Sequence, residues 1–205
     1  MIKEKFGERL DALVHVLFPF LFWRPLNPNL LSVLGALVSV GAATAFLSGH
    51  LRTGGWLMIA SGFFDLVDGA VARHNGTTST FGAFLDSTLD RLVDMAVLAG
   101  IALYYAGHGA PGVAVVAGVA LVASVLVSYA KARAEVVMPR LDAGFFERGE
   151  RMGILAFGAV TGYLPIALVV VAIGASATAL QRIAIAYREM AKIDADARPS
   201  GESAP

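Results

Sequence analysis

Long runs of hydrophobic residues, broken by short polar segments, dominate this chain. The first uncharged run extends from Asn29 to about Gly49, and as a helix it is long enough to cross a hydrocarbon layer of roughly 30 Å. Runs at 54–73 and 82–107 carry acidic residues near one end, whereas the run at 111–130 carries no charge. Each of these four runs predicts one transmembrane helix.

The uncharged stretch from Met152 to Gln181 is too long for a single crossing. Its middle contains the sequence GYLP at 162–165, where glycine and proline favour a turn. We interpret this stretch as a hairpin of two spans, of which the first is rather short. The pattern therefore predicts six transmembrane helices between residues 29 and 190.

The two ends of the chain lack such runs. Residues 2–23 place Phe6, Leu10 and other apolar side chains at helical spacing, with charged residues between them. This pattern is typical of an amphipathic helix lying in the membrane interface, although a solvated helix leading into the first span would show it too. Residues 191–205 are polar and contain proline, serine and aspartate, which predicts a disordered tail.

The composition agrees with a membrane protein. Hydrophobic residues make up 57% of the 205 positions, and the mean hydropathy is +0.68. The formal net charge of zero gives no indication of nucleic-acid binding, and the lack of cysteine excludes disulfide and thiolate chemistry. We expect an all-α integral membrane protein of one domain over 1–205: an interfacial amino-terminal helix (1–25), a six-span core (29–190) and the tail (191–205).

The basic residues predict the orientation of this domain. With six spans, segments 1–28, 73–81, 131–151 and 182–205 lie on one side and contain nearly all the lysines and arginines. The opposite loops contain only Arg52. By the positive-inside rule, both termini are expected on the cytoplasmic side of a multi-pass protein of the cell membrane.

Four aspartates lie on either side of one short polar turn. Asp65 and Asp68 are three residues apart in one predicted helix, and Asp86 and Asp90 are four apart in the next, so each pair shares a helix face. The polar sequence at 74–80 predicts a turn between the two helices. Antiparallel packing would let all four carboxylates converge on one point near the cytoplasmic face. In an apolar setting, such a cluster requires a cation.

Carboxylate oxygens are ligands for a hard divalent cation such as Mg²⁺ or Mn²⁺. Because magnesium commonly binds through carboxylates together with substrate phosphates, a phosphorylated substrate is expected. Gly69 and Gly82 leave room for a ligand, and Arg73 can bind a phosphate. The alternative, in which the aspartates only form ion pairs with Arg73 and Arg91, would neutralise two charges at most.

The spacing of these residues follows the pattern D-x2-D-G-x2-A-R-x8-G-x3-D-x3-D, from Asp65 to Asp90. The pattern resembles the signature of the CDP-alcohol phosphotransferases, whose fold is an interfacial helix followed by six spans. The resemblance implies a homodimer that transfers a phosphatidyl group from CDP-diacylglycerol to an alcohol and releases CMP. It implies that Asp65, Asp68 and Asp86 bind two metal ions. It also implies that Asp90 belongs to the metal site, close to one of the ions, and is the general base. It further implies a CDP site formed by Pro28, Asn29, Gly69, Arg73, Ser79 and Gly82.

Three further segments bear on the alcohol acceptor. The sequences SYAKARAE (128–135), FERGER (146–151) and LQR (180–182) resemble those of the phosphatidylinositol-phosphate synthases, a branch of the same family. This resemblance implies that Ser128, Lys131, Arg151 and Arg182 hold the phosphate of inositol phosphate. Glycerol phosphate or another alcohol remains the alternative acceptor. For the basic residues, the alternative is that they extend to the membrane surface and contact lipid phosphates.

Buried carboxylates also occur in membrane cation transporters, which form a different functional class. A transporter needs polar groups along a path to the far side of the membrane. The halves of the predicted spans away from the cytoplasm consist almost entirely of Val, Ala, Leu and Gly. A purely structural membrane protein would not need the carboxylates. The sequence therefore favours a metal-dependent enzyme with membrane lipids as partners.

Overall fold

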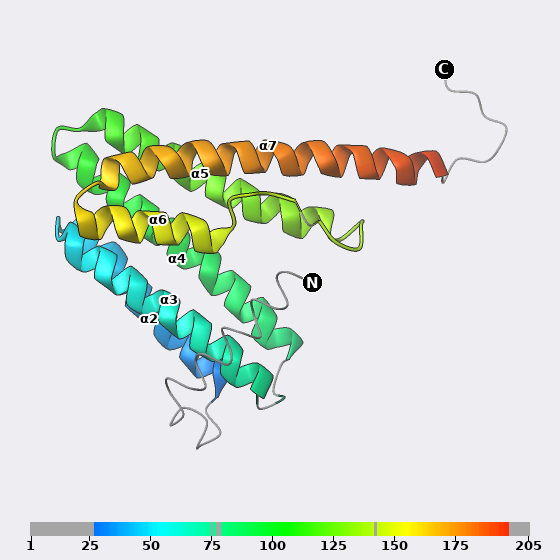
Figure 1. The fold of residues 1–205 in the computed structure, drawn as a ribbon, viewed down its shortest axis with the longest axis horizontal. Coiled ribbons are helices and arrows are strands. Elements are labelled where there is room, and N and C mark those ends of the chain that lie inside the picture. Colours follow the sequence, from blue (N-terminus) through cyan, green and yellow to red (C-terminus); the bar gives the residue numbers. More distant parts are fainter. Residues whose placement is uncertain (1–26, 75, 77–78, 142, 197–205) are drawn as a thin grey trace.

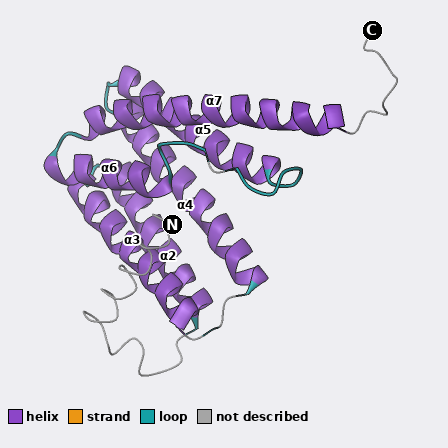
Figure 2. Cartoon of the chain, turned by 45° about the vertical axis from the view of Figure 1, so that its right-hand side comes forward, coloured by secondary structure: helices purple, strands orange, loops and turns teal. Residues whose placement is uncertain are grey.

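The computed structural model of this chain describes residues 27–74, 76, 79–141 and 143–196. Within these ranges all regular structure is helical (Figures 1 and 2). The helices are α2 (Pro28–Leu47), α3 (Leu51–His74), α4 (Thr80–Gly107), α5 (Pro111–Ala134), α6 (Arg148–Thr161) and α7 (Leu164–Asp196). The interfacial helix expected at 1–25 lies outside the described residues.

Each of the six predicted spans corresponds to one of these helices. By length and apolar composition, α2, α3, α5 and α7 are able to cross a membrane. Helix α4 has 28 residues, but its first half is charged, and α6 has only 14 residues. Large apolar side chains also cover the outside of the bundle, including Leu37, Trp56 and Ile173. The described part is thus an all-helical bundle with the character of a membrane protein.

Local sequence signals determine where several helices begin and end. The side chain of Asn27 accepts a hydrogen bond from the backbone N–H of Asn29 at 3.0 Å, and Pro28 occupies the first turn of α2. Ser79 caps α4 in the same way, accepting from the N–H of Gly82 at 2.9 Å. Gly162 adopts a left-handed conformation (φ +87°) at the end of α6, where the sequence predicts the hairpin turn.

The helices pack around an apolar core that brings distant parts of the chain together. Helix α2 packs on α3 and α4, α5 on α4 and α7, and α6 on α3 and α7 (Figure 1). The largest core cluster includes Phe46, Leu98 and Leu168, all fully buried. A Cβ atom on Gly100 would lie 2.6 Å from the backbone oxygen of Ala43, so glycine there permits the close approach of α4 to α2.

The structure corrects two helix boundaries. Helix α7 continues to Asp196 and projects beyond the other helices (Figure 1), so the prediction of disorder is wrong for residues 191–196. The ion pair between Lys192 Nζ and Glu189 Oε1, 2.7 Å apart, and good helix-forming residues favour this extension. Helix α6 begins at Arg148, four residues before the expected start at Met152.

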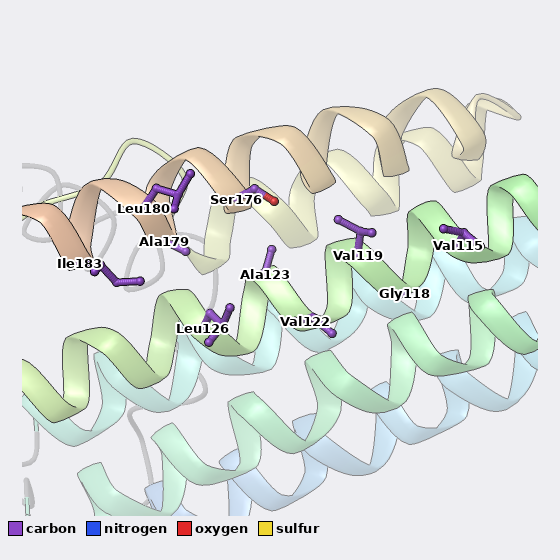
Figure 3. A pocket seen from close by; sticks show the side chains of 10 residues that line it. All are labelled: Val115, Gly118, Val119, Val122, Ala123, Leu126, Ser176, Ala179, Leu180 and Ile183. Atoms are coloured by element: carbon purple, nitrogen blue, oxygen red, sulfur yellow. The ribbon is translucent and has the colours of Figure 1, made fainter.

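An apolar groove of about 540 Å³ lies between α5 and α7 (Figure 3). Its lining consists of Val115, Gly118, Val119, Val122, Ala123, Leu126, Ser176, Ala179, Leu180 and Ile183. None of the residues that the sequence assigns to a site belongs to this groove. The candidate chemistry therefore lies elsewhere in the bundle.

Candidate active site

The six residues predicted to bind the CDP group all line one pocket. It has a volume of about 180 Å³ and lies where the start of α2, the end of α3 and the start of α4 meet. The lining residues are Pro28, Asn29, Ser32, Asp68, Gly69, Ala72, Arg73, Ser79, Gly82, Ala83 and Asp86. The pocket thus joins the predicted nucleotide residues to two of the predicted metal ligands.

Two glycines keep this pocket open. A Cβ atom on Gly69 would lie 3.1 Å from Arg73 Nη1, and one on Gly82 would lie 3.0 Å from both Asn29 Oδ1 and Ser79 Oγ. A side chain at either position would therefore press against polar groups of the lining. The space has the shape and polarity expected of a cradle for phosphates, with an arginine at its edge.

The aspartates at the end of α3 and the start of α4 are neighbours in space. Asp68 is buried, and its Oδ2 accepts a hydrogen bond from Ser32 Oγ at 2.5 Å. Electrostatic interactions connect Asp68 with Asp65 and Asp86, and Asp90 with Asp86 and Asp65. The helix spacing read from the sequence therefore places the four carboxylates in one region, as expected.

A cation from a different helix lies among these carboxylates. Arg148, the first residue of α6, places Nη1 2.5 Å from Asp65 Oδ2 and 3.1 Å from Asp90 Oδ1. Its Nε donates to Asp94 Oδ1 at 3.1 Å. The alternative in which Arg91 forms an ion pair with these aspartates is wrong, because Arg91 instead donates to the backbone and side-chain oxygens of Ser87.

Within the described ranges, no three or more Asp, Glu or His side chains form a group that could hold a metal ion as arranged. The expectation that all four carboxylates converge on a single point is wrong in that form, because the Arg148 guanidinium lies between Asp65 and Asp90. The donors themselves still suit a hard divalent cation, since they are all carboxylate oxygens beside a phosphate-sized pocket. A metal ion bound by Asp65 would replace the guanidinium as the partner of that carboxylate, while Arg148 can keep its contacts with Asp90 and Asp94.

A second and larger cavity adjoins the other side of the carboxylates. It has a volume of about 720 Å³ and lies between α3, α4 and α6. Asp65, Asp94 and Arg148 contribute polar groups to a lining that is otherwise mostly apolar. The lining includes Trp56 and Phe157, whose exposed fractions of 61% and 69% place them at the outside of the bundle. Such a cavity suits an amphiphile with a polar head and apolar chains.

Arg151 is buried inside the protein, with an exposed fraction of 1%. Its Nη1 donates to the backbone oxygen of Phe146 at 3.0 Å, and its Nη2 lies 3.7 Å from Asp94 Oδ2. Its Nε has no hydrogen-bond partner. A buried N–H that lacks a partner is costly, so this donor is available to an anion.

Arg182 is also buried, at 4% exposed. It donates from Nε to the oxygen of Ala143 and from Nη1 to the oxygen of Val127, both at 2.7 Å. Its positive charge lies close enough to Arg151 to repel that guanidinium group electrostatically. The alternative in which these two arginines extend to the membrane surface is therefore wrong.

The other two predicted acceptor residues lie in less buried surroundings. Ser128 lines a small pocket of about 10 Å³ between α4 and α5, together with Asp94. The side chain of Lys131 is 37% exposed, and its Nζ lies 3.9 Å from Oε1 of Glu135, the residue that caps the end of α5. Lys131 therefore remains accessible to a solute from the end of the bundle.

Sequence reasoning missed three residues of the site: Ser32, Asp94 and the role of Arg148. A signal existed for Asp94, because it continues the row of Asp86 and Asp90 at four-residue spacing along one face of α4. The contact of Arg148 with Asp65 joins residues 83 positions apart. No local pattern in the chain predicts such a contact.

A comparison with known protein families identifies the family of this chain. The family model described as CDP-alcohol phosphatidyltransferase matches residues 26–190, which include every helix around the site. The chain belongs to the CDP-alcohol phosphatidyltransferase family. The aspartates at 65, 68, 86 and 90 all lie within the matched residues.

Individual members of this family resemble the chain over most of its length. The phosphatidylinositol phosphate synthase of Streptomyces avermitilis is 40% identical over 86% of this chain and 78% of its own length. The archaetidylinositol phosphate synthase of Methanothermobacter thermautotrophicus is 41% identical over 68% of this chain and 69% of its own.

A solved relative has the same fold. The crystal structure of the Mycobacterium tuberculosis phosphatidylinositol phosphate synthase with CDP-DAG bound has a TM-score of 0.74 and 31% identity, covering 89% of this chain and 94% of that one. A second structure of that enzyme, in complex with manganese and citrate, has a TM-score of 0.75 and 32% identity, covering 87% of this chain and 88% of that one.

Proposed function

We propose that this protein transfers the phosphatidyl group of CDP-diacylglycerol to a hydroxyl of inositol phosphate, giving phosphatidylinositol phosphate and CMP. The observation that carries the proposal is the pocket in which all six predicted CDP residues meet Asp68 and Asp86. The similarity to phosphatidylinositol phosphate synthases, one of them solved with CDP-DAG, supports the same substrates.

The two cavities match the two halves of the lipid substrate. The polar pocket at Gly69, Arg73 and Gly82 takes the cytidine diphosphate, with Arg73 beside its phosphates. The larger apolar cavity takes acyl chains, which reach the bilayer past Trp56 and Phe157. A lipid with two chains thus stays in the membrane while its head group enters the site.

Asp90 belongs to the metal site and is also assigned the transfer of a proton. Asp65, Asp68 and Asp86 would hold two Mg²⁺ ions, with Mn²⁺ as the alternative, and these would neutralise charge that develops on the leaving CMP. Asp90 accepts the proton of the acceptor hydroxyl as that oxygen attacks the phosphorus. Its oxygen lies 3.1 Å from Arg148 Nη1, which orients the carboxylate.

Arg151 on α6 and Arg182 on α7 form the site for the acceptor phosphate. Arg151 presents a buried N–H without a partner, and Arg182 adds a second positive charge nearby. Ser128 and Lys131, on α5, complete the group of predicted acceptor residues. Two guanidinium groups favour a phosphorylated acceptor over a neutral alcohol.

The proposal includes a topology and an assembly. All six described helices span the membrane, an interfacial helix precedes them, and both termini and the site face the cytoplasm of a cell membrane. The distribution of lysine and arginine supports this orientation. Family resemblance supports a homodimer, which light scattering of the purified protein in detergent would test.

Replacing Arg151 by Ala is expected to raise the apparent KM for inositol phosphate about ten- to hundredfold, because a charge-assisted contact contributes roughly 1.5–3 kcal/mol. CDP-diacylglycerol binding should change little. Lysine at this position should restore only part of the loss, since the two-pronged geometry of guanidinium is gone. Steady-state kinetics with each substrate varied in turn measure both effects.

Arg182→Ala is expected to raise the same KM and also to lower the melting temperature, because two backbone carbonyls lose their donor. Arg188→Ala, an exposed change on the same helix, is the matched control. Unchanged inositol phosphate kinetics in both Arg151→Ala and Arg182→Ala would remove the phosphorylated acceptor from the proposal and leave only the phosphotransferase.

An acceptor panel tests the proposed substrate. Purified protein with CDP-diacylglycerol and Mg²⁺ would receive inositol phosphate, glycerol phosphate, inositol or serine, and CMP release would be measured. We expect inositol phosphate to give the highest kcat/KM. A preference for glycerol phosphate would keep the reaction and replace the acceptor, whereas a preference for free inositol would contradict the role of the arginines.

A further inference from the structure

One buried carboxylate lies between the two halves of the proposed site. Asp94, on α4, is 7% exposed and lies outside the family motif that ends at Asp90. Its side chain lines both the large apolar cavity and the small pocket that contains Ser128. Asp94 therefore borders the space for the lipid and the space next to a predicted acceptor residue.

The two oxygens of Asp94 face two different arginines. Oδ1 accepts from Arg148 Nε at 3.1 Å, and Oδ2 lies 3.7 Å from Arg151 Nη2. Arg148 in turn lies 3.1 Å from Asp90. A continuous row of ion pairs thus runs from Asp90 through Arg148 and Asp94 to Arg151.

The charges in this row are not balanced at Arg151. Asp94 carries one negative charge and contacts two guanidinium groups, while Arg148 has two further carboxylates, Asp65 and Asp90. Arg151 has Asp94 alone as a carboxylate contact in the part of the chain that the structure describes, and its Nε lacks a partner. Asp94 thus orients the guanidinium of Arg151 without fully neutralising its charge.

We propose that Asp94 is a positioning residue that aligns the phosphate of the acceptor with the general base. It holds Arg151 at a fixed place relative to Asp90, so that a phosphate bound by Arg151 brings the acceptor hydroxyl to the base. A displaced Arg151 would hold the acceptor phosphate less tightly, because small displacements of a binding group are costly. This inference rests on the proposed function.

The test is a double-mutant cycle between Asp94→Asn and Arg151→Ala. Asn keeps the size of the side chain and removes its charge, so Arg151 loses its carboxylate partner and, among the described residues, is held only by the oxygen of Phe146. The single variant Asp94→Asn should raise the KM for inositol phosphate about tenfold and leave CDP-diacylglycerol binding within about twofold. Adding Asp94→Asn to Arg151→Ala should not raise this KM further, because Asp94 acts through Arg151.

A purely structural role of Asp94 predicts a different result. Such a role would lower the melting temperature and leave the acceptor KM of the folded enzyme unchanged, which would overturn the inference. A double variant in which the two substitutions raise this KM independently would overturn it as well. Asp194→Asn, an exposed change near the end of α7, is the control. If Asp94→Asn does not fold, Asp94→Glu serves instead, because it keeps the charge and shifts its position by one methylene.

The outcomes for the inference and for the proposed function are distinct. Wild-type protein that releases no CMP with any phosphorylated acceptor would overturn both. Wild-type turnover with inositol phosphate, together with an unchanged acceptor KM in Asp94→Asn, would overturn the role of Asp94 alone. An increase in KM that disappears in the Arg151→Ala background would support it.

Discussion

Asp68→Asn and Asp86→Asn should each abolish turnover, and removal of divalent metal with EDTA should do so reversibly. Both carboxylates line the pocket of the predicted CDP group, so they lie where phosphate oxygens and a metal ion would share ligands. An amide oxygen is neutral and binds a hard cation more weakly than a carboxylate does. The measurement is CMP release before chelation, after chelation and after readdition of Mg²⁺.

A control separates metal loss from unfolding. Glu189→Gln removes a carboxylate on the polar end of α7, and we expect its activity and its response to EDTA to match the wild type. Circular dichroism should show that the variants at 68 and 86 keep their helices. Full activity in protein stripped of metal would contradict the assignment of these aspartates as metal ligands.

Asp90→Asn should lower turnover by at least the roughly 10²–10⁴-fold typical of losing a general base. The amide cannot accept the proton of the acceptor hydroxyl, but it preserves the size of the side chain and a hydrogen-bond acceptor for Arg148. CDP-diacylglycerol should therefore still bind. Binding would be measured by calorimetry in detergent, next to single-turnover kinetics.

The comparison between positions 68 and 90 decides the role of Asp90. If Asp90→Asn loses affinity for CDP-diacylglycerol as severely as Asp68→Asn does, Asp90 is mainly a metal ligand. If Asp90→Asn keeps its affinity for CDP-diacylglycerol but turns over slowly, the result supports Asp90 as the general base.

The fold could be predicted largely from the hydrophobic pattern. Each of the four runs between 29 and 130 forms one helix, and the stretch at 152–181 is divided between two. Residues such as Asn27, Ser79 and Gly162 start or end helices as their local chemistry favours. The end of α7 differs from the prediction, because a polar composition does not by itself prevent a helix from continuing. Residues 191–196 contain two alanines and a lysine, which favour helix, and they extend a helix already nucleated within the bundle.

The site was predictable where it depends on spacing within or between adjacent helices. Asp65 and Asp68 on α3 and Asp86 and Asp90 on α4 flank a single turn, so helix geometry alone brings them together. The residues of the CDP pocket surround the same turn and the start of α2. The family resemblance assigned their roles, and those assignments remain predictions.

The position of α6 could not be predicted in the same way. Arg148 reaches Asp65 because α6 packs against α3, and this contact depends on tertiary structure that no short pattern encodes. For the same reason, the sequence left two locations open for Arg151 and Arg182, the membrane surface or the protein interior. Packing decides the question, since both side chains are buried.

The most direct test of the proposed reaction is product formation by the purified protein. Incubated with CDP-diacylglycerol, inositol phosphate and Mg²⁺, the wild type should form phosphatidylinositol phosphate and CMP in equal amounts, measured by mass spectrometry and nucleotide chromatography. Omission of inositol phosphate should prevent both. Absence of a phosphatidyl product, or CMP release that does not depend on any added alcohol, would contradict the proposed function.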